Sequence, residues 1–218
     1  MNVFITGGSG FIGRGLIPAL AGRGHRVAAL VRTGSEGRLP AGCRVVVGDP
    51  LRGETYAAAA AGADCFVHLV GVSKPRPGKE REFVEIDLKS VQAAVAVARQ
   101  GKARHFLYLS VAQPAPVMRA YIEVRQRGEA LLRESGLAAT IVRPWYVLGP
   151  GRRWPVLLLP FNWLLRQIPA TREAAERLGF VTLEEITACM VHAIEHPAQG
   201  VRVIDVPGIR RMAAEAGR

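Results

Sequence analysis

The stretch VFITGGSGFIG, residues 3–13, decides the fold of this 218-residue chain. Residues 3–6 form an apolar run typical of a buried strand, a glycine-rich turn follows directly, and residues 11–22 show the apolar spacing of a helix. Because such a turn carries few side chains and leads into a helix N-terminus, its backbone N–H groups can point at a pyrophosphate. The stretch therefore predicts a dinucleotide-binding turn. Its residues are Thr6, Gly7, Gly8, Ser9, Gly10, Phe11, Ile12 and Gly13.

Short β-branched runs alternate with longer segments of helical period along the rest of the chain, as expected of βαβ units around a parallel sheet. The predicted strands cover residues 3–6, 26–32, 44–48, 64–70, 105–110, 139–143 and 201–206, and the predicted helices cover 11–22, 53–61, 80–100, 120–135 and 182–195. The strands are apolar almost throughout, which indicates that both of their faces are covered. We therefore expect an α/β fold, a Rossmann-type doubly wound parallel sheet.

After Arg143 prolines recur at short intervals and the alternation of strands and helices stops. We expect residues 1–218 to form a single dinucleotide-binding domain, in which residues 144–200 or so form a small appended substrate lobe. Within this range the segment 154–165, WPVLLLPFNWLL, is apolar nearly all round and too short to span a bilayer. A buried helix, an apolar substrate pocket, a dimer surface and a contact with a membrane surface through the flanking Arg152, Arg153 and Arg166 all remain open.

The end of the second predicted strand, residues 28–32, reads AALVR and contains no carboxylate. An acidic side chain at this place would bind the 2′-hydroxyl of the adenine ribose and favour NAD. Arg32 can instead form charge-assisted hydrogen bonds to a 2′-phosphate. The expected cofactor is therefore NADP(H), with NAD(H) as the alternative.

Further motifs follow the glycine turn in a fixed order. They are Gly48-Asp49, His68-Leu69-Val70-Gly71, Tyr108-Leu109-Ser110, Ser135-Gly136-Leu137, Thr140-Ile141-Val142-Arg143-Pro144 and Gly149-Pro150-Gly151. Together they resemble the atypical short-chain dehydrogenase/reductases, above all the NmrA-like NAD(P)H-binding branch, and also the nucleotide-binding accessory subunit of respiratory complex I. The resemblance implies further cofactor contacts. For the adenine these are Asp49 and Leu51, for its ribose and the pyrophosphate Val70 and Gly71, and for the nicotinamide Pro144, Trp145 and Val147.

Enzymes of this family use a Tyr as acid and base, a Lys four residues later that holds the nicotinamide ribose, and a Ser that orients the substrate carbonyl. By the resemblance, the matching residues here are Tyr121, Arg125 and Ser110. Arg125 keeps the helical spacing to Tyr121 and can donate to a ribose, but unlike Lys it cannot pass on a proton. Two functions therefore remain open: an NADP-dependent oxidoreductase or isomerase acting on an apolar carbonyl or hydroxyl substrate, and a non-catalytic NADP(H)-binding redox sensor or assembly factor.

The net charge of +11 comes mostly from scattered arginines, which we interpret as ordinary surface positions rather than a nucleic-acid surface. The three cysteines predict neither a disulfide framework nor a zinc site. His192 and His196 have the spacing of metal ligands but lack a third ligand, and His68 is expected in the core.

The chain has no apolar run long enough for a membrane span and no secretion signal at its N-terminus, so we expect a cytoplasmic protein.

Overall fold

A seven-stranded parallel sheet organises the computed structural model, which describes residues 1–72, 75–151 and 169–216. The strand order is β3-β2-β1-β4-β5-β6-β9. After β3 the chain crosses back over β1, and the later strands are added on the other side, from β4 outward. The strands are β1 (Asn2–Thr6), β2 (Arg26–Val31), β3 (Cys43–Val47), β4 (Cys65–His68), β5 (His105–Leu109), β6 (Ala139–Val142) and β9 (Val201–Ile204). The predicted Rossmann-type α/β fold is confirmed.

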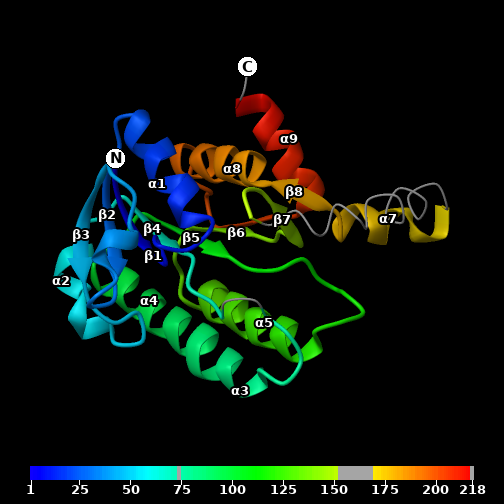
Figure 1. Ribbon diagram of the computed structural model, residues 1–218, viewed down its shortest axis with the longest axis horizontal. Coiled ribbons are helices and arrows are strands. Elements are labelled where there is room, and N and C mark those ends of the chain that lie inside the picture. The colour runs from blue at the N-terminus through cyan, green and yellow to red at the C-terminus, as the bar shows by residue number, and fades with distance from the viewer. Residues whose placement is uncertain (73–74, 152–168, 217–218) are drawn as a thin grey trace.

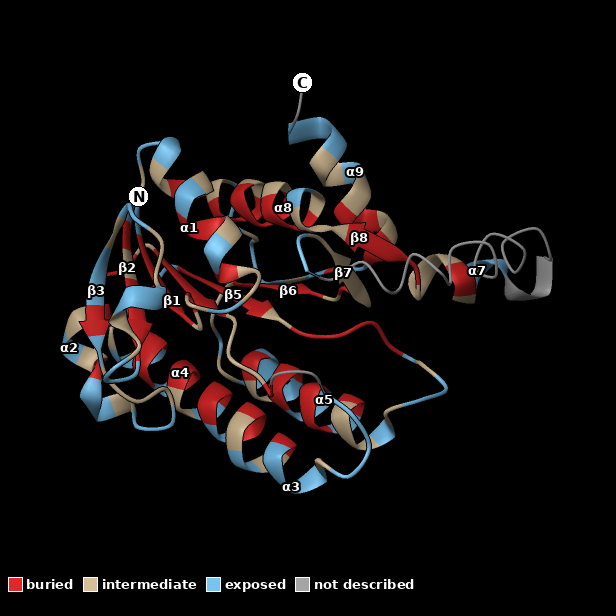
Figure 2. Cartoon of the chain, viewed as in Figure 1, coloured by how far each residue is buried: buried red, intermediate tan, exposed pale blue. Residues whose placement is uncertain are grey.

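Helices cover both faces of this sheet (Figure 1). On one face lie α1 (Gly13–Gly22), α8 (Leu183–Glu195) and α9 (Val206–Ala216); on the other lie α2 (Ala57–Ala60), α3 (Glu80–Glu82), the π-helical η3 (Phe83–Leu88), α4 (Lys89–Gln100) and α5 (Arg119–Glu134). Neighbouring residues of a central strand alternate between the two cores. Phe66 faces the α4 side, where its ring stacks on Phe106 at 5.2 Å, whereas Val67 faces α1 and α8. Figure 2 shows the resulting buried band through the sheet and the inner sides of the helices.

Several predicted elements differ from the observed ones; among the strands, β4 ends at His68 rather than at residue 70. The helix expected over residues 80–100 is interrupted by the π-helical turn of η3, and that expected over 53–61 is only a 3-10 turn, Gly53–Thr55, followed by α2. The last strand ends at Ile204 rather than at residue 206, because α9 begins at Val206. Pro207 made a helix at this place unexpected from the sequence. A proline is nevertheless tolerated in the first helical turn, because the N–H that it lacks would have no partner within the helix there.

The range predicted as an appended lobe contains two kinds of structure. Strands β7 (Tyr146–Leu148) and β8 (Phe180–Thr182) pair in a separate two-stranded sheet. Helix α7 (Pro169–Arg177) precedes β8 along the chain. Helix α8 instead packs beside α1 on the main sheet. Its predicted capping box is confirmed, since Thr182 Oγ1 accepts the N–H of Glu185 at 3.0 Å and the Thr182 N–H donates to the Glu185 carboxylate at 2.6 Å.

The apolar segment 154–165 and the arginines that flank it lie outside the described residues. Among the helices of the described part of the chain, none is long and apolar enough to cross a membrane.

The glycine turn between β1 and α1 is built by close contacts between backbone segments. Gly7 has a φ of +79°, and a Cβ on it would lie 2.8 Å from the carbonyl carbon of Leu69. A Cβ on Gly13 would lie 2.5 Å from the carbonyl oxygen of Gly8. The first glycine therefore lets the turn approach the segment after β4, and the last lets α1 approach the turn.

Replacing Gly13 by Ala should lower the free energy of unfolding by about 1–3 kcal/mol, because the added methyl group meets backbone that has no room to yield. Urea unfolding measures this change. Gly22→Ala is the matched control, since it lies in the same helix with no atom within 4 Å of the added Cβ. If both variants were as stable as the parent, the close packing of α1 on the turn would be refuted.

Two histidines are fully buried on neighbouring strands. His68 Nδ1 lies 2.8 Å from Thr6 Oγ1, and His105 Nε2 lies 3.0 Å from Thr140 Oγ1. Burial, with a smaller effect of Arg125, lowers the pKa of His68 to about 3. Burial, with a smaller effect of Arg202, lowers the pKa of His105 to about 4. His68 is thus a neutral core residue, as predicted.

These histidines should make the protein less stable as the pH falls from about 6.5 to about 4. Over this range the unfolded chain binds protons that the folded chain excludes, which costs at most about 1.4 kcal/mol per pH unit for each histidine. Urea unfolding at about pH 7 and about pH 5 measures the slope. His68→Gln and His105→Gln should each reduce it; equal slopes in all three proteins would contradict the assignment.

Candidate cofactor and active site

The glycine turn offers a helix N-terminus to a ligand. Helix α1 begins without a side-chain cap and without an acidic residue in its first turn, and the turn itself is closed by the Gly10 N–H, which donates to the Gly7 carbonyl at 3.0 Å. Ser9 is half-buried and Gly10 is exposed, whereas Thr6 lies beneath the turn with its hydroxyl against His68. An uncapped helix N-terminus in a cradle that a Cβ would fill fits the pyrophosphate of a dinucleotide.

Residues predicted to contact the adenosine end follow β2 and β3. Arg32 comes directly after β2 and is exposed, while the nearby Glu36 carboxylate accepts the N–H of Gly34 at 3.2 Å. After β3, Asp49 Oδ1 accepts the N–H of Leu51 at 2.9 Å and so shapes its own turn. The Leu51 side chain is exposed. The carboxyl ends of these strands therefore present the exposed Arg32 and the half-buried carboxylate of Asp49.

The segment after β4 lies against a buried ion pair. Asp87 Oδ1 lies 2.5 Å from Arg125 Nη2, and Asp87 Oδ2 accepts the N–H of Val72 at 2.9 Å. Gly71 sits on the guanidinium, since a Cβ there would be 2.1 Å from Arg125 Nη2. Burial raises the pKa of Asp87, and the neighbouring Arg125 opposes that rise.

Sequence reasoning did not single out Asp87. The available signal was its spacing: it lies four residues after Phe83 and four before Val91, both of which are buried on the apolar side of this helical segment. A carboxylate at such a position calls for a buried cationic partner.

Tyr121 and Arg125 come together on α5, as their spacing predicts. The Arg125 guanidinium lies 5.2 Å from the centre of the Tyr121 ring and 5.8 Å from that of Tyr108. Its Nη1 donates to the Leu109 carbonyl at 2.9 Å. The Tyr121 ring is half-buried and meets Phe83 edge-on at 5.1 Å. Arg125 is thus fixed between β4, β5 and α5 rather than pointing into solvent.

Ser110 belongs to a different cluster, centred on the buried Glu129. The Ser110 hydroxyl donates to Glu129 Oε1 at 2.6 Å, and Gln113 Nε2 donates to the same oxygen at 2.7 Å. Arg143 and Arg133 pair with this carboxylate as well. Burial alone would raise the pKa of Glu129, but its bonds with Arg143 and Ser110 outweigh burial and hold the pKa below the usual value. The hydroxyl proton of Ser110 is therefore directed at an ionised carboxylate.

The residues predicted beside the nicotinamide connect β6 with the small sheet. Pro144 is buried and its carbonyl accepts the N–H of Ala112 at 2.9 Å. Trp145 is half-buried and packs edge-on against Tyr146, which in turn stacks on Phe180 at 5.8 Å. Val147, in β7, packs on the core shared by α1 and α8. These residues form one wall at the carboxyl end of β6.

The glycine turn also touches this region through Phe11. A Cβ on Gly149 would lie 2.8 Å from the Phe11 ring and 3.3 Å from the Cβ of Leu183. The Phe11 ring therefore lies against the segment after β7.

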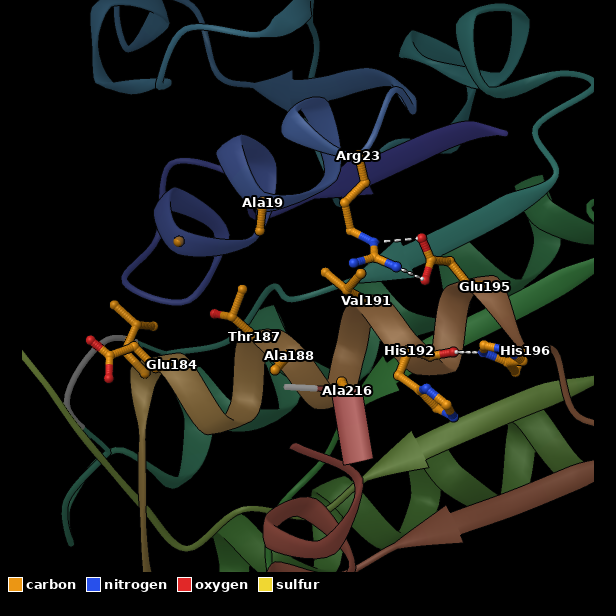
Figure 3. A pocket seen from close by; sticks show the side chains of 12 residues that line it. Ala19, Arg23, Glu184, Thr187, Ala188, Val191, His192, Glu195, His196 and Ala216 are labelled. Atoms are coloured by element: carbon orange, nitrogen blue, oxygen red, sulfur yellow. Dashed lines mark hydrogen bonds and ion pairs between the residues drawn. The ribbon is translucent and has the colours of Figure 1, made fainter. Parts of the chain in front are cut away.

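A cavity of about 460 Å³ lies elsewhere, in the groove between α1 and α8 (Figure 3). Arg23 and Glu195 pair across it at 2.7 Å, and the rings of His192 and His196 stack at 4.1 Å. None of the predicted site residues lines it. Within the described ranges, no three His, Cys, Asp or Glu side chains are grouped to hold a metal ion.

Comparisons with known proteins identify the family of this chain. A family model described as NAD(P)H-binding matches residues 7–153. A ceramide reductase of Caulobacter vibrioides is 30% identical over 216 residues, covering 96% of this chain and 65% of the relative. The photosystem II assembly factor Ycf39 of Cyanophora paradoxa is 26% identical over 150 residues, covering 66% of this chain and 44% of the relative. The chain thus spans less than two thirds of the length of either relative.

Solved structures show the same fold. The Bordetella bronchiseptica enzyme WbmH, in complex with NAD+, superimposes with a TM-score of 0.70 at 19% identity, covering 94% of this chain and 75% of that protein. The family model spans the glycine turn and the carboxyl ends of β2 to β6, where the candidate site residues gather. The chain therefore belongs to the NAD(P)H-binding family of atypical short-chain dehydrogenase/reductases.

Proposed function

We propose that this chain is an NADP(H)-dependent oxidoreductase that reduces a small apolar carbonyl compound or oxidises the corresponding hydroxyl compound. The observation that carries the proposal is the position of Tyr121. Its half-buried ring lies against the guanidinium of Arg125. That guanidinium in turn contacts Leu109 at the end of β5 and Gly71 in the segment after β4. A phenol held in this position can donate the proton that the reduction of a carbonyl requires.

The cofactor would supply the hydride, and this chain would hold it along the carboxyl edge of the sheet. The turn from Gly7 to Gly13 would bind the pyrophosphate through its amides, and Asp49 and Leu51 would border the adenine. Arg32 would pair with the 2′-phosphate, because it is exposed and follows β2 with no acidic residue at that strand end. Val70 and Gly71 would border the adenine ribose.

The substrate would lie between Tyr121 and the wall formed by Pro144, Trp145 and Val147, with the range 144–200 as the substrate lobe. Tyr121 would hold the proton at its phenolic oxygen, and Arg125 would stabilise the phenolate without exchanging a proton itself. Ser110 directs its own proton at Glu129, so in this proposal it supports the β5 end instead of polarising the carbonyl.

A second function is favoured by the way the polar groups are occupied. Arg125 is bound to Asp87 and Leu109, and Ser110 is bound to Glu129, so both groups that would assist Tyr121 already have partners. A protein that binds NADP(H) without turnover, as a redox sensor or assembly factor, needs only the cofactor contacts. The relative Ycf39 is named as an assembly factor.

NADPH should bind at least about tenfold more tightly than NADH, a difference of about 1.4 kcal/mol. In fluorescence titrations, Arg32→Ser should remove most of this difference by weakening NADPH binding while NADH binding stays within about twofold. Arg26→Ser, at the opposite end of the same strand, is the control and should bind both cofactors as the parent does. Tighter binding of NADH by the parent would refute the assignment of Arg32.

Oxidation of NADPH with a panel of apolar aldehydes and ketones tests Tyr121. Tyr121→Phe should lower turnover at least about 100-fold, because the phenolic proton is lost, and should leave the affinity for NADPH within about twofold. A Phe variant as active as the parent would remove Tyr121 from the mechanism. A parent protein that binds NADPH tightly and turns over no member of the panel would support the second function instead.

A further inference from the structure

We propose that Asp87 is a positioning residue for the dinucleotide: it fixes the backbone of residues 70–72, against which the cofactor would lie, relative to the glycine turn. The inference rests on the cofactor site proposed above and adds a residue to it. Asp87 acts through its neighbours, since its side chain is 0% exposed and no ligand can touch it.

The carboxylate of Asp87 joins four segments of the chain. One oxygen accepts the N–H of Val72, after β4, at 2.9 Å. The other lies 2.5 Å from Arg125 Nη2 on α5, and Arg125 Nη1 reaches on to the Leu109 carbonyl at the end of β5 at 2.9 Å. Asp87 itself stands on η3, a π-helical turn of a kind often found at functional sites. One carboxylate therefore connects η3, the segment after β4, α5 and the end of β5.

Two parts of the structure contact the segment after β4. Gly71 lies on the ion pair, with room for no side chain, because a Cβ would be 2.1 Å from Arg125 Nη2 and 3.0 Å from Asp87 Oδ1. The glycine turn touches the neighbouring residue, because a Cβ on Gly7 would be 2.9 Å from the Val70 nitrogen. The segment that would border the cofactor therefore contacts the glycine turn at residue 70 and the ion pair at residue 71.

Loss of the Asp87 carboxylate would affect the affinity for a dinucleotide in two opposite ways, one through charge and one through position. Removal of the Asp87 carboxylate leaves Arg125 as an uncompensated cation, and its charge would attract an anionic dinucleotide more strongly. Removal of the anchor also frees Val72 and Arg125, which would misplace residues 70–72 and weaken binding. Since the two effects differ in sign, the direction of the affinity change identifies the role of Asp87.

Asp87→Asn is the first test, with NADPH as the titrated ligand. We expect the Kd to rise at least about tenfold, or about 1.4 kcal/mol, in spite of the lost negative charge. Glu85→Gln is the matched control, because it removes an exposed carboxylate from the same π-helical turn and should keep the Kd within about twofold. Circular dichroism and a thermal melt, with titration well below the melting temperature, separate a change in affinity from a loss of fold. An unchanged or lower Kd for a folded Asp87→Asn protein overturns the proposal.

Gly71→Ala is the second test, because its Cβ pushes the guanidinium aside without changing any charge. It should also raise the Kd, and the double variant with Asp87→Asn should bind about as weakly as the weaker single variant, since both changes disturb one unit. If Asp87→Asn fails to fold, an unchanged Kd in Gly71→Ala overturns the proposal by itself. If the parent protein binds neither NADPH nor NADH, the proposed cofactor site is refuted. If the parent binds NADPH and both single variants bind it with the same Kd, only the role of Asp87 is refuted.

Discussion

The contact of backbone with backbone around the glycine turn is the constraint on which the rest of the structure depends. Gly7 lies against the segment after β4, and Gly13 lies against Gly8, at distances where a methyl group would collide with main-chain atoms. These contacts bring the N-terminus of α1 to the centre of the sheet edge, beside the carboxyl ends of β1 and β4. The N-terminus of α1 and the start of the segment after β4 therefore lie next to each other at this edge of the sheet.

The sequence predicts the parallel sheet well because its information is local. Each central strand is a short apolar run, and the glycine turn and the capping box at Thr182 are patterns of consecutive residues that need no knowledge of distant contacts. Helix α9 was missed for an equally local reason, since Val206-Pro207-Gly208 resembles a helix stop and is here a helix start. Periodicity also cannot show the π-helical turn of η3, which inserts itself inside an otherwise regular helical stretch.

The candidate site was harder to predict because its contacts join residues far apart in the chain. The spacing of Tyr121 and Arg125 gives their proximity, but the partner of Arg125 lies 38 residues earlier, at Asp87, and no local pattern connects them. Likewise Ser110 stands at the predicted strand end, yet only the fold shows that its hydroxyl donates a hydrogen bond to Glu129. A buried ion pair of this kind stabilises little by itself, because desolvation offsets the attraction, but breaking it is costly. Such a pair holds geometry more than it adds stability.

Phe11 gives the glycine turn a second neighbour. Its ring lies close to Gly149, so one side chain joins the turn to the segment after β7. The free energies of ordering these two segments are therefore not independent, and substitutions in them should be non-additive. A change at Phe11 alters the packing of the turn and of the region after β7 together, and thermodynamic linkage requires that the coupling free energy between them be the same in both directions.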